Sequence, residues 1–364
     1  MKFTPTTHEL LAAKSEAADN RPSNLTAPGL HVSGSHWDVE HLRALRVLAF
    51  DNMAPEKLVP LPYMPQSTSN EFGGLIQAIQ APSRAEIRLW EATGYQNENN
   101  PFNPFFSSLS DAMTKMDDIV ARLRPGEGPA YGDALAEESE SSQEDELEGA
   151  PRQALQALAR VVARHVSKVN APFRMQMHIN DIPLKLYLGP DQGRPSLREA
   201  RNDGGIVLVS SHDQTHGSIP LVGFESKRRH AAGAHHYTGQ PETYNRQTLA
   251  QEVAELLAQA LAGYRLDGPN QDEEAFLLTI HGTQLRLVTA YFTADYLRHV
   301  QSTTMPVDQF LFVRRSRFYE LKEPAQRVEA LKLIIGLFRY VVGGYAQMKQ
   351  ITGFANILRQ HYGL

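Results

Sequence analysis

Two acidic residues and a lysine lie beside short apolar runs in the middle of this 364-residue chain. The runs Ile206–Val209 and Ile219–Phe224 flank the polar stretch HDQTHG, which predicts an antiparallel hairpin. The second strand ends in Glu225, Ser226 and Lys227. Because successive strand side chains point to opposite faces, Glu225 and Lys227 share one face and Ser226 points to the other. A carboxylate and a cation are therefore expected side by side.

A second carboxylate is expected at the same place. With the turn centred near Gln214, the hairpin register sets Asp203 opposite Ser226, within one residue. An Asp, a Glu and a Lys that converge at one end of a hairpin can hold a divalent cation and position a water against a phosphodiester. Asp213 is closer to Glu225 in sequence, but the hairpin places it in the turn, far from Glu225 along the strand. We therefore assign the second carboxylate to Asp203.

These residues resemble the D…E-x-K motif of the PD-(D/E)XK nuclease superfamily, with Asn202 in the place of the family's proline. The surrounding segments resemble a fungal branch of that superfamily: a helix with Gln251 and Glu255, then FLLTIHGTQLRLVTAYF, then RSRFYEL and a terminal helix. The similarity covers roughly residues 150 to 345. It implies a restriction-endonuclease-like α/β fold, with a mixed sheet flanked by helices.

The resemblance also implies the chemistry of the site. Asp203, Glu225 and the backbone carbonyl of Ser226 would bind Mg²⁺ or Mn²⁺. Lys227 would orient or activate the attacking water, and Gln251 matches the family's helix glutamine, a group that positions substrate or water. The expected function is Mg²⁺-dependent hydrolysis of nucleic acid, with DNA favoured over RNA.

Three other interpretations of the motif stay open. Arg228 and Arg229 extend the cationic surface and are candidates for contacts with substrate phosphates, or they are part of a solvated charge run. Glu225 and Lys227 could simply end an ordinary strand. A nuclease-fold module that binds nucleic acid or a protein partner without cutting is the alternative function, because fold does not guarantee activity. A homodimer is a possible assembly.

Competing motifs fail on their spacing. Histidines at 212, 216, 230, 235 and 236 suggest zinc, but the chain has no HExxH, and adjacent histidines on a strand face apart. The chain also contains no GxxxxGK[ST], GxGxxG or GxSxG, which excludes the commonest nucleotide-binding and serine-hydrolase motifs.

Composition is that of a globular protein with about two domains. Hydrophobic residues make up 41% of the chain and the mean hydropathy is -0.38. No apolar stretch approaches the roughly 20 residues that span a bilayer, so no membrane association is expected. The N-terminus has no apolar signal core and the chain has no cysteine. Both features favour an intracellular setting, in the nucleus or the cytoplasm.

The net charge of -5 comes largely from one segment. Seven acids without a base lie between residues 137 and 148, and the rest of the chain carries +2 without them. The charge is therefore compatible with a nucleic-acid partner. We expect a disordered tail over 1–34, a helical N-terminal region over 35–125, an acidic disordered linker over 126–150, the nuclease-like domain over 151–345 and a C-terminal helix over 346–364.

Periodicity predicts the elements that must position the motif. In the N-terminal region Ser35-His36-Trp37-Asp38 resembles a capping box, which predicts a helix from Ser35 to about Phe50. The remaining predictions are helices over 151–169, 244–264 and 325–342, a strand over 173–188 bent near residue 180, strands over 276–280 and 285–291, and a strand at FLFVRR. The strand–helix–strand crossing after Lys227 should place its two strands parallel.

Overall fold

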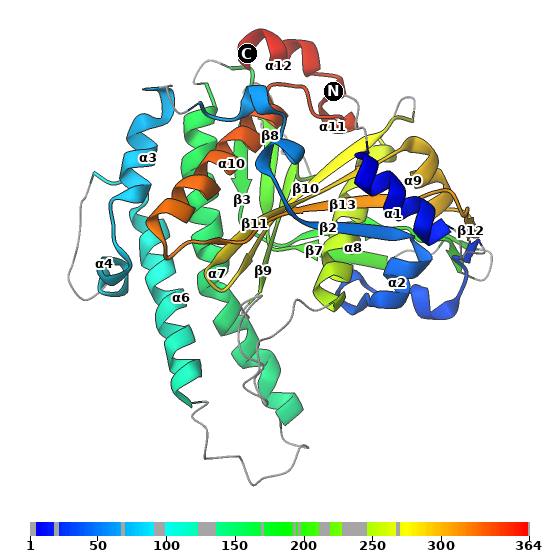
Figure 1. Ribbon diagram of the computed structural model, residues 1–364, viewed down its shortest axis with the longest axis horizontal. Coiled ribbons are helices and arrows are strands. Elements are labelled where there is room, and N and C mark those ends of the chain that lie inside the picture. Colours follow the sequence, from blue (N-terminus) through cyan, green and yellow to red (C-terminus); the bar gives the residue numbers. More distant parts are fainter. Residues whose placement is uncertain are drawn as a thin grey trace.

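The computed structural model describes residues 5–17, 22–66, 70–90, 99–122, 136–168, 171–191, 194–195, 198–210, 219–227, 246–266 and 270–362. These residues form a mixed α/β structure in which one large sheet is flanked by helices on both faces (Figure 1). Among them, no helix is both long and apolar enough to cross a membrane.

The described part of the central sheet has eight strands. Their order is β2 (Val47–Met53), β13 (Leu311–Ser316), β11 (Gln284–Phe292), β10 (Glu273–His281), β9 (Val222–Lys227), β8 (Gly205–Ser210) and β3 (Phe173–His178), and β14 (Tyr319–Glu320) pairs with β11. β2 runs parallel to β13 and β9 parallel to β10, whereas the other neighbours are antiparallel.

The crossing from β9 to β10 is made through α8 (Arg246–Tyr264), and the parallel pairing predicted for these strands is confirmed. β10 and β11 form the longest pair, with nine partners from Glu273↔Phe292 to His281↔Gln284. Gly282, in the turn between them, has a φ of 60°, a conformation that glycine adopts without strain.

Two hydrophobic cores lie on the two faces of the sheet. One face is covered by α7 (Ala136–Val166) and α10 (Pro324–Val342), with α3 (Gly73–Gln80), α4 (Arg84–Arg88) and α6 (Asn103–Arg122) outside them. The other is covered by α8, with α2 (Val39–Ala44) and α9 (Ala294–Val300) beside it. β10 is buried on both faces: Phe276 and Leu278 belong to the first core and Leu277 to the second. This explains why residues 275–278 are all apolar rather than alternating with polar residues.

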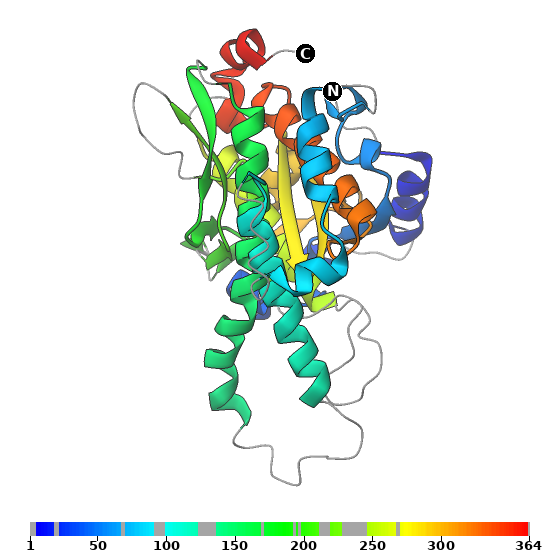
Figure 2. The same ribbon diagram turned by 90° about the vertical axis from the view of Figure 1, so that its left-hand side faces the viewer.

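α6 and α7 lie side by side and extend together past the end of the sheet (Figure 2). α7 begins at Ala136, so helix covers most of the acidic segment for which a disordered linker was predicted. The linker was predicted because the acidic segment has few apolar residues that could be buried, without regard to its helix propensity. Glutamate has a high helix propensity, and the segment continues directly into the packed turns that follow Gly149, so no separate nucleation is needed.

The N-terminal region also differs from the prediction. The tail predicted over 1–34 contains α1 (Thr7–Ala17), β1 (Ser23–Asn24) paired with β12 (Thr304–Met305), and the one-turn helix η1 (Pro28–Leu30). Leu25 and Leu30 are buried there. Two isolated leucines in a polar sequence gave no periodic signal, although burial beside β12 and α2 anchors the segment.

The helix predicted from Ser35 to Phe50 is too long at both ends. α2 begins at Val39 and ends at Ala44, Arg46 has a φ of 54°, and the chain then enters β2. The N-cap is Asp38 rather than Ser35, since the Asp38 carboxylate accepts from the N–H groups of Glu40 and His41. β2 pairs with β13, which follows more than 260 residues later, and local periodicity cannot reveal such a partner.

The strand predicted over 173–188 is divided. β3 joins the central sheet, whereas β4 (Ile182–Leu186) pairs with β7 (Arg198–Asn202) in a separate ribbon that packs against α8. A two-residue pair, β5 (Pro190–Asp191) and β6 (Arg194–Pro195), lies between them in sequence. The short helices η2 (Gly34–His36), η3 (Pro55–Lys57), η4 (Leu61–Tyr63) and η5 (Asn70–Phe72) lie in the N-terminal part, and α11 (Lys349–Thr352) and α12 (Ala355–Tyr362) end the chain's described part.

Candidate active site at the end of strand β9

β9, which carries the predicted motif, lies in the interior of the sheet between β8 and β10 (Figure 1). It pairs with β8 at Gly205↔Gly223 and with β10 at Glu225↔Thr279. Phe224 packs into the core under α7 and α10. Because side chains alternate along a strand, Gly223 and Glu225 face the opposite layer, under α8.

Asp203 immediately precedes β8 and lies against the end of β9. Its N–H donates to the Phe224 carbonyl (2.8 Å), and its Oδ2 accepts from the Ser226 N–H (2.7 Å) and from the Ser226 hydroxyl. The ladder between β8 and β9 stops before Ser226, so this carboxylate supplies the acceptor that a longer strand would provide. From α7, Arg152 NH1 lies 3.7 Å from Oδ1, and Gln156 Nε2 donates to the Asp203 carbonyl (3.1 Å).

The contact between Asp203 and Ser226 confirms the register predicted for the hairpin. In a strand, the N–H and C=O groups of one residue point toward the same neighbour. Since the Ser226 N–H points at Asp203, the Ser226 carbonyl lies on that same side of β9. The Asp203 carboxylate and the Ser226 carbonyl therefore lie on the same edge of β9, at a point where β8 no longer pairs with it.

Gly204 lets the chain place Asp203 there. Its φ is 120°, and a β-carbon at this position would lie 2.5 Å from the His178 carbonyl oxygen. Only glycine combines this backbone conformation with the close approach to β3. The Asp-Gly-Gly sequence is thus a structural requirement for the position of the acid.

Glu225 lies on the α8 side and is buried, with 5% of its surface exposed. Glu255 of α8 is buried to the same extent. One helical turn further along α8, Gln259 Nε2 donates to the Pro220 and Leu221 carbonyls (2.7 and 3.0 Å), just before β9. Glu255 therefore lies closer to the end of β9, in the same layer as Glu225. Two carboxyl groups are thus buried in the layer between α8 and the end of β9.

A second group of buried charges continues along the α8 face. Arg286 NH2 lies 3.0 and 3.2 Å from the two carboxylate oxygens of Glu252, and Arg315 NH1 lies 3.6 Å from Glu252 Oε2. Asp51 of β2 completes the group, with Oδ1 2.7 Å from Arg315 Nε and 3.7 Å from Arg286 NH1. His281 Nε2 lies 3.9 Å from Glu252 Oε1. We call these five residues, four of them buried and Asp51 exposed, the buried charge network.

The buried charge network shares its layer with Glu225. Arg286 is paired with Thr279 across β10 and β11, and Thr279 is paired with Glu225 across β10 and β9. A polar row thus crosses the sheet beneath the N-terminal half of α8. With two carboxylates and two guanidinium groups, the network is close to internal charge balance.

Sequence reasoning missed the buried charge network. The available signal was a charged residue at an inward position of an apolar strand, as Arg286 in LRLV and Arg315 in FVRRS. Nothing in the sequence indicated which acid of α8 would meet these cations, because that choice depends on how the helix is rotated over the sheet.

The structure places two further predicted groups away from the motif. Gln251 Nε2 donates to the Ser35 carbonyl (2.7 Å), so this side chain joins α8 to η2. Asn202, in the place of the proline, is 1% exposed, and its amide lies directly over Gly223, on the α8 side. Neither amide atom of Asn202 has a hydrogen-bond partner within the described residues.

Some predicted residues lie outside the described residues. These are Asp213, Arg228, Arg229 and the side chain of Lys227, whose backbone ends β9 opposite His281. Within the described part, no group of three or more His, Asp or Glu side chains could hold a metal ion. A Mg²⁺ ion needs only one or two carboxylates with backbone, water and substrate oxygens. Asp203 and Glu225 supply carboxylates, but Asp203 bonds to the Ser226 hydroxyl on the α7 side of β9, whereas Glu225 faces α8.

Comparison with known proteins gives no relative from which a role could be transferred. No family model matches the chain, and no curated protein matches its sequence.

Proposed function

We propose that this protein is a Mg²⁺-dependent phosphodiesterase that cuts nucleic acid, DNA in preference to RNA, and that its fold is restriction-endonuclease-like. The observation that carries the proposal is the contact of Asp203 with Ser226 at the end of β9, one residue from Glu225. Asp203 thus lies against the end of β9, which consists of Glu225, Ser226 and Lys227. The Asp203 carboxylate meets the Ser226 hydroxyl on the α7 side of β9, whereas Glu225 faces α8, so the proposal requires the two acids to reach one ion from opposite sides of the strand end.

The order of the elements supports the same proposal. α7, β3, β8, β9, α8 and β10 follow one another among the main elements, and in the sheet β10 lies beside β9, then β8, then β3. The antiparallel β3–β8–β9 unit and the parallel β9–β10 pair agree with the mixed sheet that the resemblance implies. The β4–β7 ribbon is inserted between β3 and β8.

Each residue has a role in the proposed reaction. Asp203, Glu225 and the Ser226 carbonyl hold the metal, which when bound supplies Lewis acidity and a water of lowered pKa. The Lys227 ammonium orients that water and stabilises the charge that develops on the phosphoryl oxygens. The Arg152 guanidinium, 3.7 Å from Asp203, keeps a cation beside this carboxylate when no substrate is present.

A non-cutting module that binds nucleic acid or a protein partner is the second candidate, and two observations favour it. Glu225 is buried, and Asp203 Oδ2 already accepts two hydrogen bonds from Ser226. Carboxylates engaged in this way can serve the stability of the strand end alone.

Calorimetric titration with Mg²⁺ tests the metal site. Wild type should bind one ion weakly, and Glu225→Gln should weaken the binding about tenfold or more, because one of two anionic ligands becomes neutral. Glu199→Gln, on the exposed edge of β7, is the matched control and should bind like wild type. Equal Mg²⁺ affinity in wild type and Glu225→Gln would show that Glu225 is not a metal ligand.

A further inference from the structure

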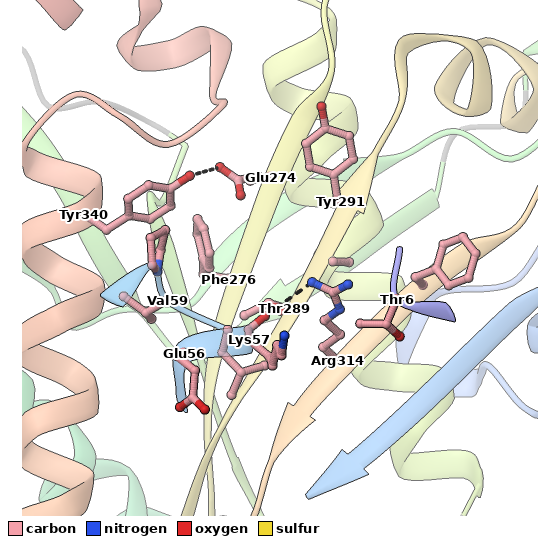
Figure 3. A pocket seen from close by; sticks show the side chains of 14 residues that line it. Thr6, Glu56, Lys57, Val59, Glu274, Phe276, Thr289, Tyr291, Arg314 and Tyr340 are labelled. Carbon is pink, nitrogen blue, oxygen red and sulfur yellow. Dashed lines mark hydrogen bonds between the residues drawn. The ribbon is translucent and has the colours of Figure 1, made fainter. Parts of the chain in front are cut away.

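A pocket of about 260 Å³ lies on the other face of the sheet, away from α8 (Figure 3). Glu274, Phe276, Tyr291 and Arg314 contribute to it from β10, β11 and β13. Its remaining wall comes from the segment 56–60, from Tyr340 of α10 and from Thr6 just before α1. The pocket is therefore assembled from segments far apart in the sequence, and none of the groups proposed to act at β9 lines it.

One end of the pocket carries a fixed carboxyl group. Glu274 Oε2 accepts hydrogen bonds from the Tyr340 hydroxyl (2.8 Å) and from the Gln347 N–H (2.7 Å). Within the described residues, no hydrogen bond reaches Oε1. Burial raises the pKa of Glu274, although these two hydrogen bonds oppose the rise. The group is thus held in one orientation with one oxygen available as an acceptor.

Aromatic rings surround this carboxyl group. Phe276 and Tyr340 meet edge to face, with centroids 6.2 Å apart. Tyr291 lies on the other side of Glu274 (Figure 3), and its hydroxyl donates to Asp272 Oδ2 (2.6 Å) rather than to the pocket. Thr289 is buried between these strands, and its side chain has no hydrogen bond within the described residues. This end therefore offers two acceptors, Glu274 Oε1 and the Thr289 hydroxyl, beside the largely buried rings of Phe276 and Tyr340.

The other end of the pocket carries charges of both signs. Lys57 is exposed at the rim, and its ammonium has no ion pair among the described residues. Arg314 is held by Glu9 of α1 (2.6 and 2.7 Å) and by the Lys57 carbonyl (3.3 Å), so its guanidinium is a fixed wall rather than an available donor. Glu9 neutralises Arg314, which leaves Lys57 as the available cation beside the acidic Glu56.

We propose that this pocket binds a small bipolar molecule, with N–H donors directed at Glu274 and Thr289, a flat body between the aromatic rings and an anionic group at Lys57. The volume of about 260 Å³ is just below the usual range of ligand pockets, roughly 300 to 1,000 Å³. It fits one compact ring system and excludes a nucleic-acid chain. A nucleoside monophosphate and an aromatic amino acid both have this chemistry.

The site is independent of the proposed nuclease function. Phe276 and Tyr340 belong to the core under α7 and α10, whereas Glu225 lies in the layer under α8. An inactive protein could still bind this ligand, and a pocket without a ligand would leave the cleavage chemistry unaffected.

Calorimetry on the full chain with guanosine 5′-monophosphate, tryptophan and inorganic phosphate as separate probes tests the proposal. One of the first two should give saturable binding, and which one does so identifies the ligand class. Glu274→Gln should weaken that binding about tenfold, since a hydrogen bond to a charged acceptor is lost. Lys57→Gln should weaken it about threefold at low salt, and less at high salt.

Thr289→Val provides a second variant in case Glu274→Gln unfolds. It removes a hydroxyl with no hydrogen bond in the described structure, so stability should be retained while affinity falls. Lys185→Gln, exposed on β4, is the control for Lys57→Gln and should bind like wild type. Phosphate binding as tight as the nucleotide, no saturable binding of either ring-bearing probe, or equal affinities in wild type, Glu274→Gln and Thr289→Val would overturn the proposal.

Discussion

At the scale of single residues, Asp203 has two separable tasks. It accepts hydrogen bonds from Ser226, which requires only an oxygen, and we propose that it binds a metal ion, which requires a charge. The amide of an asparagine at this position keeps an acceptor oxygen and removes the charge. Comparing the two substitutions Asp203→Asn and Asp203→Ala therefore separates a structural role from a metal-binding one.

We expect Asp203→Ala to lower the free energy of unfolding by about 1–3 kcal/mol, because the Ser226 N–H loses its acceptor at a buried strand end. Asp203→Asn should cost about 1 kcal/mol or less, and still lose Mg²⁺ binding. Urea unfolding and calorimetry measure the two effects. An Asp203→Asn protein that binds Mg²⁺ like wild type would exclude Asp203 as a ligand.

Adjacent acids on β10 illustrate how strongly the environment of one residue controls its ionisation. Glu273 is buried beside Gly263 of α8, and both of its oxygens lie 3.1 Å from the Lys349 N–H. Burial raises the pKa of Glu273 to about 8, although the Lys349 hydrogen bonds oppose the rise. The folded protein therefore holds a proton on Glu273 that the unfolded chain releases at lower pH.

This proton sets the direction of a pH effect. Between the ordinary pKa of 4.5 and about 8, the folded state binds more protons than the unfolded state, so the free energy of unfolding falls as pH rises through that window. Glu273→Gln should lose less stability than wild type between pH 5 and pH 8.5, by a difference on the order of 2 kcal/mol. Urea unfolding at both pH values measures it, with exposed Glu199→Gln as control. Parallel pH profiles for wild type and Glu273→Gln would refute the assignment.

Much of the motif's geometry could be predicted at this scale, and the rest could not for a physical reason. The hairpin register brought Asp203 to Ser226, because pairing along a strand is fixed by residue spacing. Gln251, by contrast, bonds to Ser35, and Asn202 turns to the side opposite the Asp203–Ser226 contact. The positions of these two side chains depend on residues distant in the sequence, which the spacing of the motif cannot reveal.

At the scale of elements, α8 is attached to the sheet through Glu252. This carboxylate meets Arg286 of β11 directly and Arg315 of β13 at 3.6 Å, so it links one helix to two strands. Arg286 also lies over the Phe318 ring, 4.4 Å from its centroid. Removing the acid takes away the buried carboxylate that contacts both guanidinium groups, whereas Asp51, which also contacts them, is half exposed.

We expect Glu252→Ala to lower the free energy of unfolding by about 3–5 kcal/mol, since one partner of a buried ion pair is left without the other. The double variant Glu252→Leu with Arg286→Met should recover most of this loss, because both charges go and apolar volume replaces them. Denaturant unfolding of the single and double variants gives the coupling energy. Strictly additive losses would mean that Glu252 and Arg286 do not act as a pair.

Elements with strong local signals were predicted well. α8, α10, β10, β11 and β13 appear where their periodicity placed them. The predictions were wrong where contacts between distant parts of the chain determine the structure. β2 forms by pairing with β13, and the segment over 23–30 is held by β12 and α2. The acidic part of α7 was not predicted for a different reason, because a helix that is already anchored can extend into a polar segment without a new nucleation step.

At the scale of the whole molecule, one sheet carries two separate polar sites on its two faces. The α8 face holds Glu225 and the buried charge network, whereas the opposite face holds the pocket at Glu274. The strand order from β10 to β3 could be predicted in part from the sequence, through the β8–β9 hairpin and the crossover from β9 to β10. The rest of the sheet, with β2 at its edge, depends on a pairing between distant parts of the chain. Catalysis is proposed only for the end of β9.

The most direct test of the central claim is cleavage of single- and double-stranded DNA by the purified protein with Mg²⁺ or Mn²⁺. Wild type should cut, and Lys227→Ala should remain folded but lose roughly 10²–10³ in rate, because a fixed ammonium no longer stabilises the developing phosphoryl charge. Asp213→Asn, predicted to lie in the hairpin turn, is the control and should cut like wild type. A protein that binds Mg²⁺ but leaves DNA and RNA intact, or a Lys227→Ala variant that cuts as fast as wild type, would contradict the proposed active site.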